Sequence, residues 1–222
     1  MMPTPKTHRF QSILCVLDLS RASATALSYA RAMAASSGAT LTALLAPGAL
    51  RSAKGTADAE AGVIMRAARR LRADVVIMST TAHDGRDPSF DSTTASVLRR
   101  YGGAVLVVPP HSRTPRGAWP GPSVAAAVSD DDRHRHAQIA AAARMAEHFG
   151  AWLSTVPVIP GDRRRRDRAS LIIFALPRAG RARTLQQGSA AQRFICKAIS
   201  PVLVVRTPGA SGRKRPPARR AA

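Results

Sequence analysis

The stretch Ser92–Val108 reads STTASVLRRYGGAVLVV, and it has a counterpart at Ser189–Val205, which reads SAAQRFICKAISPVLVV. Each stretch begins with serine, continues through an amphipathic segment of helix length and a short break, and ends in Val-Leu-Val-Val. A repeat of this length indicates that one supersecondary unit occurs twice. The sequence therefore predicts two copies of one α/β unit.

Earlier parts of the two halves also correspond, since Met33–Leu41 matches Met145–Leu153 at its Met-Ala, Gly-Ala and Leu positions. The 222 residues suit two small domains of about 100 residues each. The expected division is an N-terminal extension at 1–11, a first domain at 12–109, a Pro/Gly/Arg linker at 110–122, a shortened second domain at 123–206 and a basic, disordered tail at 207–222.

Apolar runs of strand length alternate with amphipathic segments of helix length. Continuously apolar strands between helices predict parallel sheets covered on both faces, that is, two Rossmann-like units. The strands are expected at 12–17, 39–45, 74–78, 105–108, 124–128, 152–159, 170–174 and 202–205. The helices are expected from cap Ser20 to Gly38, at 58–72, at 92–101, up to Phe149 and at 188–198.

Helical periodicity predicts which side chains of the first two helices face the core. These are Ala24, Leu27, Ala30 and Met33 in the first helix, and Val63, Ile64, Ala67, Ala68 and Leu71 in the second. The second half has no sequence of helix length between its strands at 152–159 and 170–174, so we expect that unit to be truncated.

The charge is strongly positive: 34 Lys and Arg oppose 13 Asp and Glu, which gives +21. Such a balance favours attraction to polyanions, although a general compositional bias toward Arg explains it equally. The charge is concentrated at 163–168 and 213–220. These segments leave open a docking surface for an acidic protein, or for nucleic acid through the basic tail.

Other features favour a cytoplasmic protein without a metal site. Cys15 and Cys196 lack metal or redox spacing and are expected to be buried thiols. Residues 1–11 lack the apolar core of a secretory signal, and no apolar run reaches the length of a membrane span. The acidic run Asp130–Asp132 is better explained by helix capping than by metal binding, even with His134 and His136 nearby.

Together these segments resemble the universal stress protein family in its tandem two-domain form. The resemblance rests on the opening strand Ile13–Asp18 followed by Ser20, on 32–45, on 74–78 and on the two repeated blocks. It implies two adenine nucleotide alpha hydrolase-like units. It also implies that the last strands, Val105–Val108 and Val202–Val205, pair with each other, and such pairing would cover two apolar sheet edges.

The resemblance also implies a place for an adenine nucleotide such as ATP. In ATP-binding members the loop after the fourth strand reads Gly-x2-Gly-x9-Gly-Ser/Thr, whose glycines let backbone N–H groups approach phosphates. An Asp at the end of the first strand contacts the adenine side. In the first half Asp18 and Ser92 match, but Ser79, Ala82 and Asp91 occupy the glycine positions.

In the second half Gly188 and Ser189 match, while Ala175 and Arg178 stand at the first two glycine positions. The first strand there ends in Ser129 followed by Asp130, so the adenine-side Asp is absent or shifted. Arg178 could pair with a phosphate directly, or it could be a solvated loop cation. Neither half holds the complete motif.

The residues offer no catalytic triad, paired carboxylates or Walker loop, so an enzyme is not expected. The leading interpretation is a non-catalytic stress-response or regulatory protein with a degenerate nucleotide site. A true ATP-binding switch with weak hydrolysis and a nucleic-acid-associated protein remain the alternatives. Association of two chains is left open.

Overall fold

The computed structural model describes residues 10–46, 57–80, 92–115, 117, 119–128, 132–158, 169–177 and 189–207. The first half contains β1 (Ser12–Leu17), α1 (Arg21–Ser37), β2 (Thr40–Leu45), α2 (Ala57–Arg70), β3 (Val75–Ser79), α3 (Ser92–Arg100) and β4 (Ala104–Val108). The second half contains β5 (Ser123–Val128), α4 (Asp132–Phe149), β6 (Trp152–Pro157), β7 (Leu171–Pro177), α6 (Ala190–Cys196) and β8 (Val202–Thr207).

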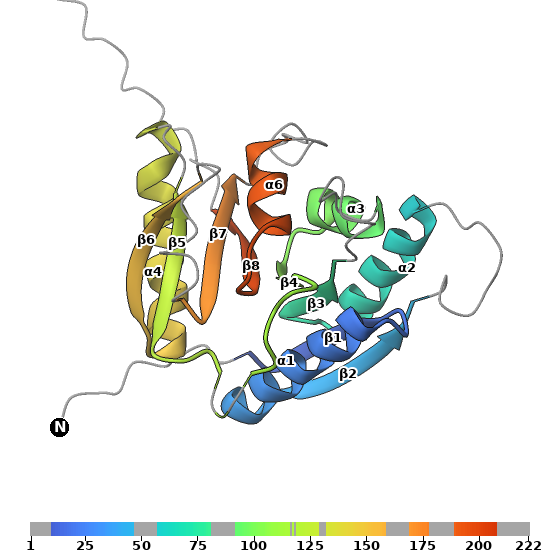
Figure 1. The fold of residues 1–222 in the computed structure, drawn as a ribbon. Coiled ribbons are helices and arrows are strands. Elements are labelled where there is room, and N and C mark those ends of the chain that lie inside the picture. Colours follow the sequence, from blue (N-terminus) through green and yellow to red (C-terminus); the bar gives the residue numbers. More distant parts are fainter. Residues whose placement is uncertain are drawn as a thin grey trace, which may run out of the picture.

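All eight strands form one sheet in the order β2-β1-β3-β4-β8-β7-β5-β6 (Figure 1). Pairing is parallel within each half and antiparallel only between β4 and β8. There Val105 lies opposite Val204 and Leu106 opposite Leu203. The predicted α/β class and the predicted pairing of the last two strands are confirmed. The strand order of the second half is the reverse of that of the first, and the two halves meet at the β4–β8 pair, which we call the seam.

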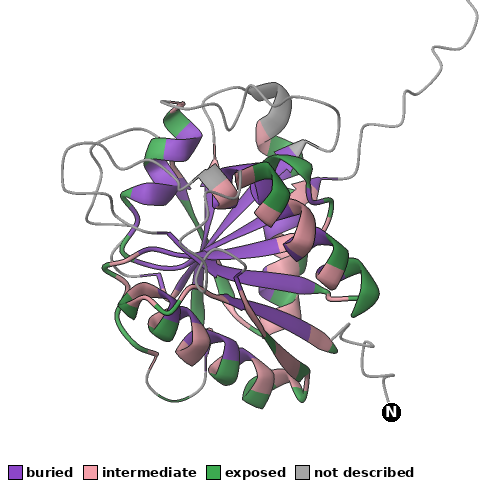
Figure 2. Ribbon diagram, turned by 90° about the vertical axis from the view of Figure 1, so that its right-hand side faces the viewer, coloured by how far each residue is buried: buried purple, intermediate pink, exposed green. Residues whose placement is uncertain are grey.

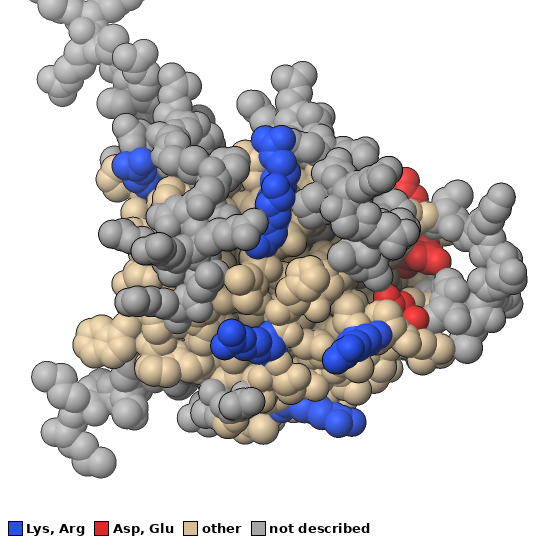
Figure 3. Space-filling model, in the orientation of Figure 1, with Lys and Arg blue, Asp and Glu red and all other residues tan. Residues whose placement is uncertain are grey.

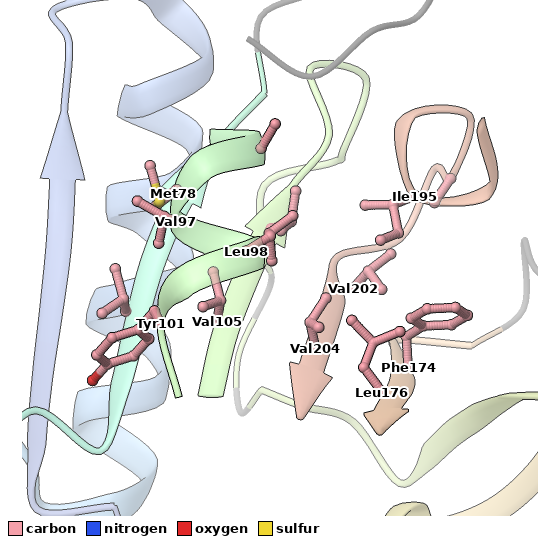
Figure 4. Packing of buried hydrophobic residues seen from close by; sticks show 14 of the residues in the cluster. Met78, Val97, Leu98, Tyr101, Val105, Phe174, Leu176, Ile195, Val202 and Val204 are labelled. Carbon is pink, nitrogen blue, oxygen red and sulfur yellow. The ribbon is translucent and has the colours of Figure 1, made fainter. Parts of the chain in front are cut away.

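Helices cover both faces of the sheet, and the strands between them are largely buried (Figure 2). One hydrophobic cluster packs α2, α3 and α6 on one face, and the other packs α1 and α4 on the opposite face. Each cluster draws residues from both halves, as Val105 and Val204 show beside Leu98 and Ile195 (Figure 4). The core therefore continues across the seam, and the division into two domains stays a prediction.

The ends of α1 follow the chemistry read from the sequence. The Ser20 hydroxyl accepts a hydrogen bond from the Ser23 N–H at 3.1 Å, which caps the amino end. Gly38 adopts the left-handed conformation with φ 71°, and its N–H donates to the Ala34 carbonyl at 2.8 Å. A side chain at Gly38 would strain this turn, so the helix ends where predicted.

The predicted inward faces of the first two helices are confirmed at Ala30, Met33, Ile64 and Ala68 and are wrong at Ala24 and Leu71. In α1, Ala24 is exposed and Leu27 is half-buried, whereas the buried residues are Ser23, Ala26, Tyr29, Ala30 and Met33. In α2, Leu71 lies beyond the helix and is exposed, whereas the buried residues are Ala61, Ile64, Met65 and Ala68. The α1 face is shifted because Tyr29 packs edge-on against Trp119, with ring centroids 5.0 Å apart.

Residues assigned to connecting segments also enter the fold. Phe10, expected in the extension, packs against His148 with ring centroids 4.6 Å apart. Trp119, expected in the linker, is buried and donates its Nε1–H to the Ser170 carbonyl at 3.1 Å. Thr207, expected in the tail, ends β8. Each expected boundary therefore excluded a residue that packs between the two halves or completes the sheet.

Two expectations concern segments outside the described residues. The helix-free connection within the second half falls mainly on 159–168, and the expected disorder of the tail falls on 208–222. Both stay predictions. Among the helices that the structure describes, none is both long and apolar enough to cross a membrane.

Candidate functional site

The sheet order places a topological switch point in each half. From β1 the chain passes to β2 on one side and to β3 on the other, and β5 stands in the same relation to β6 and β7. Ligands of open α/β sheets bind at the carboxyl ends of strands beside such a point. Asp18, directly after β1, and Ser79, the last residue of β3, therefore lie at the same end of the sheet. Their role in binding a nucleotide stays a prediction.

The Asp18 carboxylate is engaged in its own turn. Its Oδ1 accepts a hydrogen bond from the Ser20 N–H at 2.9 Å, across Leu19, which has φ 65° and an exposed side chain. Burial acts to raise the pKa of Asp18, but hydrogen bonds from Ser20 and Ser23 outweigh it and lower that pKa below its ordinary value. Asp18 thus remains an anion that orients the start of α1.

Ser79 stands where the family motif has the first glycine of its loop, but in this structure it is the last residue of β3. It is buried and lies opposite Val108 in the β3–β4 register. Its carbonyl accepts a hydrogen bond from the Thr94 hydroxyl of α3 at 3.4 Å, and the next N–H, that of Thr80, donates to the Val108 carbonyl at 3.1 Å. The Thr80 N–H is therefore engaged in the sheet and is not free for a phosphate.

Unlike the groups just described, the Thr80 hydroxyl has no hydrogen-bond partner within the structure. The residue is 2% exposed, and its Oγ1 is buried. An unpaired buried hydroxyl costs about 1–3 kcal/mol, so such a group is a candidate contact for a ligand or water. Sequence reasoning missed Thr80 because a single threonine after an apolar strand carries no distinguishing pattern.

The corresponding edge of the second half is occupied by protein contacts. Ala175 lies inside β7 opposite Val205 and is buried, so it is not a loop residue. Its carbonyl accepts a hydrogen bond from the Gln138 side chain of α4 at 3.4 Å. The next carbonyl, of Leu176, accepts one from the Thr207 hydroxyl at 3.3 Å.

Ser189 caps the amino end of α6, with its hydroxyl accepting from the Gln192 N–H at 3.2 Å. This is the capping role that serines at helix starts commonly have. Ser92 begins α3, but its side chain lies outside the described part of the chain. Ala82, Asp91, Arg178 and Gly188 also lie outside it, so their predicted roles stay predictions.

Among the residues that the structure describes, no three His, Cys, Asp or Glu side chains come together in a group that could hold a metal ion. Cys15 and Cys196 are both buried, as predicted. Burial raises the pKa of Cys15 to about 12, which keeps it protonated at neutral pH. Cys15 therefore has the character of a core side chain and not of a nucleophile.

The charges of the described residues are unevenly placed. In the orientation of Figure 1, the visible Lys and Arg side chains stand apart on uncharged surface, while the visible acidic side chains gather near α2 (Figure 3). On that side Asp58 accepts a hydrogen bond from the Ser96 hydroxyl at 2.6 Å and pairs with Arg100 at 3.5 Å. Thr93 donates to Glu60 at 2.8 Å, so these acids connect α2 to α3.

Comparison with known proteins bears on the fold. A universal stress protein from Archaeoglobus fulgidus DSM 4304 superposes with a TM-score of 0.55 at 13% identity, over 90% of this chain and 98% of that one. A functionally unknown protein from Pseudomonas aeruginosa PAO1 gives 0.57 at 15% identity, over 89% and 93%. A candidate universal stress protein from P. aeruginosa UCBPP-PA14 gives 0.53 at 16% identity, over 89% and 94%.

No family model matches the sequence, and no curated protein matches it either. The likeness is therefore one of structure and extends over nearly the whole chain. The chain has a Rossmann-like α/β fold that matches the fold of these universal stress proteins. Its own eight strands form one sheet.

Proposed function

We propose that this chain is a non-catalytic regulatory protein of the universal stress type whose adenine-nucleotide site is degenerate. The fold supports the class. The observation that carries the proposal is the hydrogen bond from the Thr80 N–H to the Val108 carbonyl, 3.1 Å long. It engages in the sheet an N–H that a phosphate-binding loop would present to its ligand.

Two further contacts support the same conclusion. The Asp18 carboxylate accepts a hydrogen bond within its own turn, and Ala175 of the second half is paired inside β7. Each of these positions is therefore satisfied within the chain. A protein of this type would act through its surface and its partners and would not depend on nucleotide turnover.

The experiment is mass spectrometry of small molecules released from gently purified full-length protein, followed by an assay for ATP hydrolysis. The proposal predicts neither a stoichiometric adenine nucleotide nor hydrolysis above a heat-treated control. A co-purified nucleotide at one per chain would contradict it. Asp18→Ala protein, prepared in parallel, identifies whether any nucleotide found depends on the first half.

A second candidate, an ATP-binding switch with weak hydrolysis, is favoured by the unpaired Thr80 hydroxyl near the end of β1. In that case Thr80 would donate to or accept from the nucleotide, and Asp18 would face its base. Thr80→Val removes the hydroxyl while keeping the shape of the side chain. Nucleotide found on the parent protein and missing from Thr80→Val would support this candidate over the first.

A further inference from the structure

We propose that exposed arginines at the carboxyl ends of α2 and α3 form a binding surface for the phosphate backbone of nucleic acid. This arginine surface consists of Arg69, Arg70, Arg72 and Arg99. All four are exposed, and three of them occupy the last turns of the two helices. The proposal goes beyond the regulatory function above, and it does not involve the residues at the switch points.

Tyr101 connects the segments that follow the two helices. Its hydroxyl donates to the Ala73 carbonyl, just after α2, at 3.0 Å. Its own backbone follows α3. Burial, and then the charge of Asp74, raise the pKa of the Tyr101 hydroxyl, while the nearby charge of Arg69 opposes them. The segments that follow α2 and α3 are therefore joined through one tyrosine side chain, beside the exposed Arg69, Arg70 and Arg72. The guanidinium of Arg100 reaches the other way, to Asp58 in the first turn of α2, so Arg100 is not part of this surface.

The acidic residues nearby leave most of this charge uncompensated. Asp58 is engaged with Ser96 and Arg100, and Asp74 accepts hydrogen bonds from the Gln11 and Ser12 N–H groups at 2.7 and 3.0 Å. Arg100 forms the one ion pair found among the described residues. The four arginines of the surface form no ion pair within the part of the chain that the structure describes.

The position of Arg206 extends this surface toward the basic tail. The guanidinium donates to the carbonyls of Leu98, Arg99 and Tyr101, so the end of β8 is fixed beside the last turn of α3. Beyond Thr207 the sequence contains no acidic residue and adds five cations, which are Arg213, Lys214, Arg215, Arg219 and Arg220. The basic sequence thus begins at the arginine surface.

The chemistry of the surface favours nucleic acid over a membrane. Guanidinium groups match phosphate oxygens in a bidentate geometry, and spaced phosphates suit several arginines at once. A membrane surface would also require apolar side chains, but among the described residues Leu71 is the only large exposed one near these helix ends. The exposed Trp152 lies on the edge strand β6, away from them, so base stacking is not offered. Binding is therefore expected to follow the backbone without sequence preference.

The test compares two full-length variants of equal net charge. One replaces Arg69, Arg70, Arg72 and Arg99 by Gln. The matched control replaces four exposed arginines of the other face and its loops by Gln, namely Arg21, Arg31, Arg113 and Arg144. Binding of a short fluorescent duplex DNA, and of an RNA duplex of the same sequence, is followed by anisotropy between about 50 and 200 mM salt.

The surface variant should bind at least about tenfold more weakly at the lowest salt, and its salt slope should fall by about 0.9 for each phosphate that it no longer neutralises. The control variant should bind like the parent. Weaker binding of either duplex by the surface variant supports the proposal. Whether the DNA or the RNA duplex is the one affected identifies the kind of nucleic acid that is bound. Equal weakening of both variants would show that net charge alone acts, and would overturn it.

Two further results would also overturn the assignment. One is binding that disappears when the chain is ended after Thr207 but is unchanged in the surface variant, because the tail alone would then be responsible. The other is binding to anionic vesicles but to neither duplex. Far-ultraviolet circular dichroism checks folding, and the milder Arg70→Gln and Arg99→Gln pair repeats the test should the quadruple variant unfold.

Discussion

The guanidinium of Arg206, near the end of β8, donates a hydrogen bond to the backbone carbonyl of Tyr101, just beyond α3, at 3.3 Å. The same Nη2 reaches the carbonyls of Leu98 and Arg99. The last carbonyls of a helix have no partner within the helix, and a cation there is favoured by the helix dipole. One side chain of the second half thus completes a helix of the first, beside the seam between β4 and β8.

Replacing Arg206 by Ala should therefore destabilise the whole protein. Hydrogen bonds that involve a charged group contribute about 1.5–3 kcal/mol each, but partial exposure reduces this, so we expect a loss of about 1–3 kcal/mol in the free energy of unfolding. Urea denaturation measures it. Arg31→Ala, at an exposed position on α1, is the control and should change stability by less than about 0.5 kcal/mol. Equal effects of the two substitutions would contradict a capping role for Arg206.

The two tryptophans should report very different environments. Trp119 is 5% exposed against Tyr29, whereas Trp152 is 82% exposed at the start of β6. Iodide should quench only part of the parent fluorescence. In Trp119→Phe nearly all remaining fluorescence should be quenched, and in Trp152→Phe nearly none. Similar quenching of the two variants would contradict the placement of residue 119 in the core.

Acid should destabilise the fold partly through Asp18. Its pKa is lowered in the folded protein relative to about 3.9 in the unfolded chain, so its stabilising contribution is complete above that value. The contribution is lost as the pH falls through the lower, folded pKa. Asp18→Asn should therefore show a shallower decline of stability below about pH 4, measured by urea denaturation at a series of pH values. An unchanged slope would mean that the turn with Ser20 does not stabilise the carboxylate.

Cys15 should be inert in the native state. Burial raises its pKa to about 12, and its side chain is fully enclosed, so neither the thiolate nor access is available near pH 8. In a Cys196→Ala background, a thiol reagent such as DTNB should react with Cys15 only after denaturation. Rapid reaction of the native protein would require local opening of β1, which its pairing with β2 on one side and β3 on the other opposes.

The repeat of Ser92–Val108 at Ser189–Val205 predicted two copies of one α/β unit, and the resemblance to universal stress proteins implied that their last strands pair, as β4 and β8 do. Local rules also placed Ser20 and Gly38 at the ends of α1, because capping depends on residues adjacent in sequence. The predicted inner faces of α1 and α2 were partly wrong. Those faces depend on distant partners, such as Trp119 for Tyr29, which no local periodicity contains.

The sequence predicted where the candidate site lies better than it predicted how the residues there are hydrogen-bonded. The sequence located Asp18 and Ser79 at one edge, since both follow or end parallel strands. It did not reveal that the Thr80 N–H binds Val108 or that its hydroxyl is unpaired, because both depend on the strand register. The role of Arg206 was missed for the same reason: its partners precede it by more than a hundred residues.

The central claim is that the adenine-nucleotide site is degenerate. Its most direct test is to titrate the full-length protein with ATP and to measure the thermal unfolding midpoint at each concentration. A ligand that binds only the folded state raises stability in proportion to the logarithm of its concentration over its dissociation constant. The degenerate site predicts an unchanged midpoint up to millimolar ATP. A saturable rise that Asp18→Ala and Thr80→Val abolish, but that the control Arg31→Ala preserves, would contradict it and would make the protein a nucleotide switch.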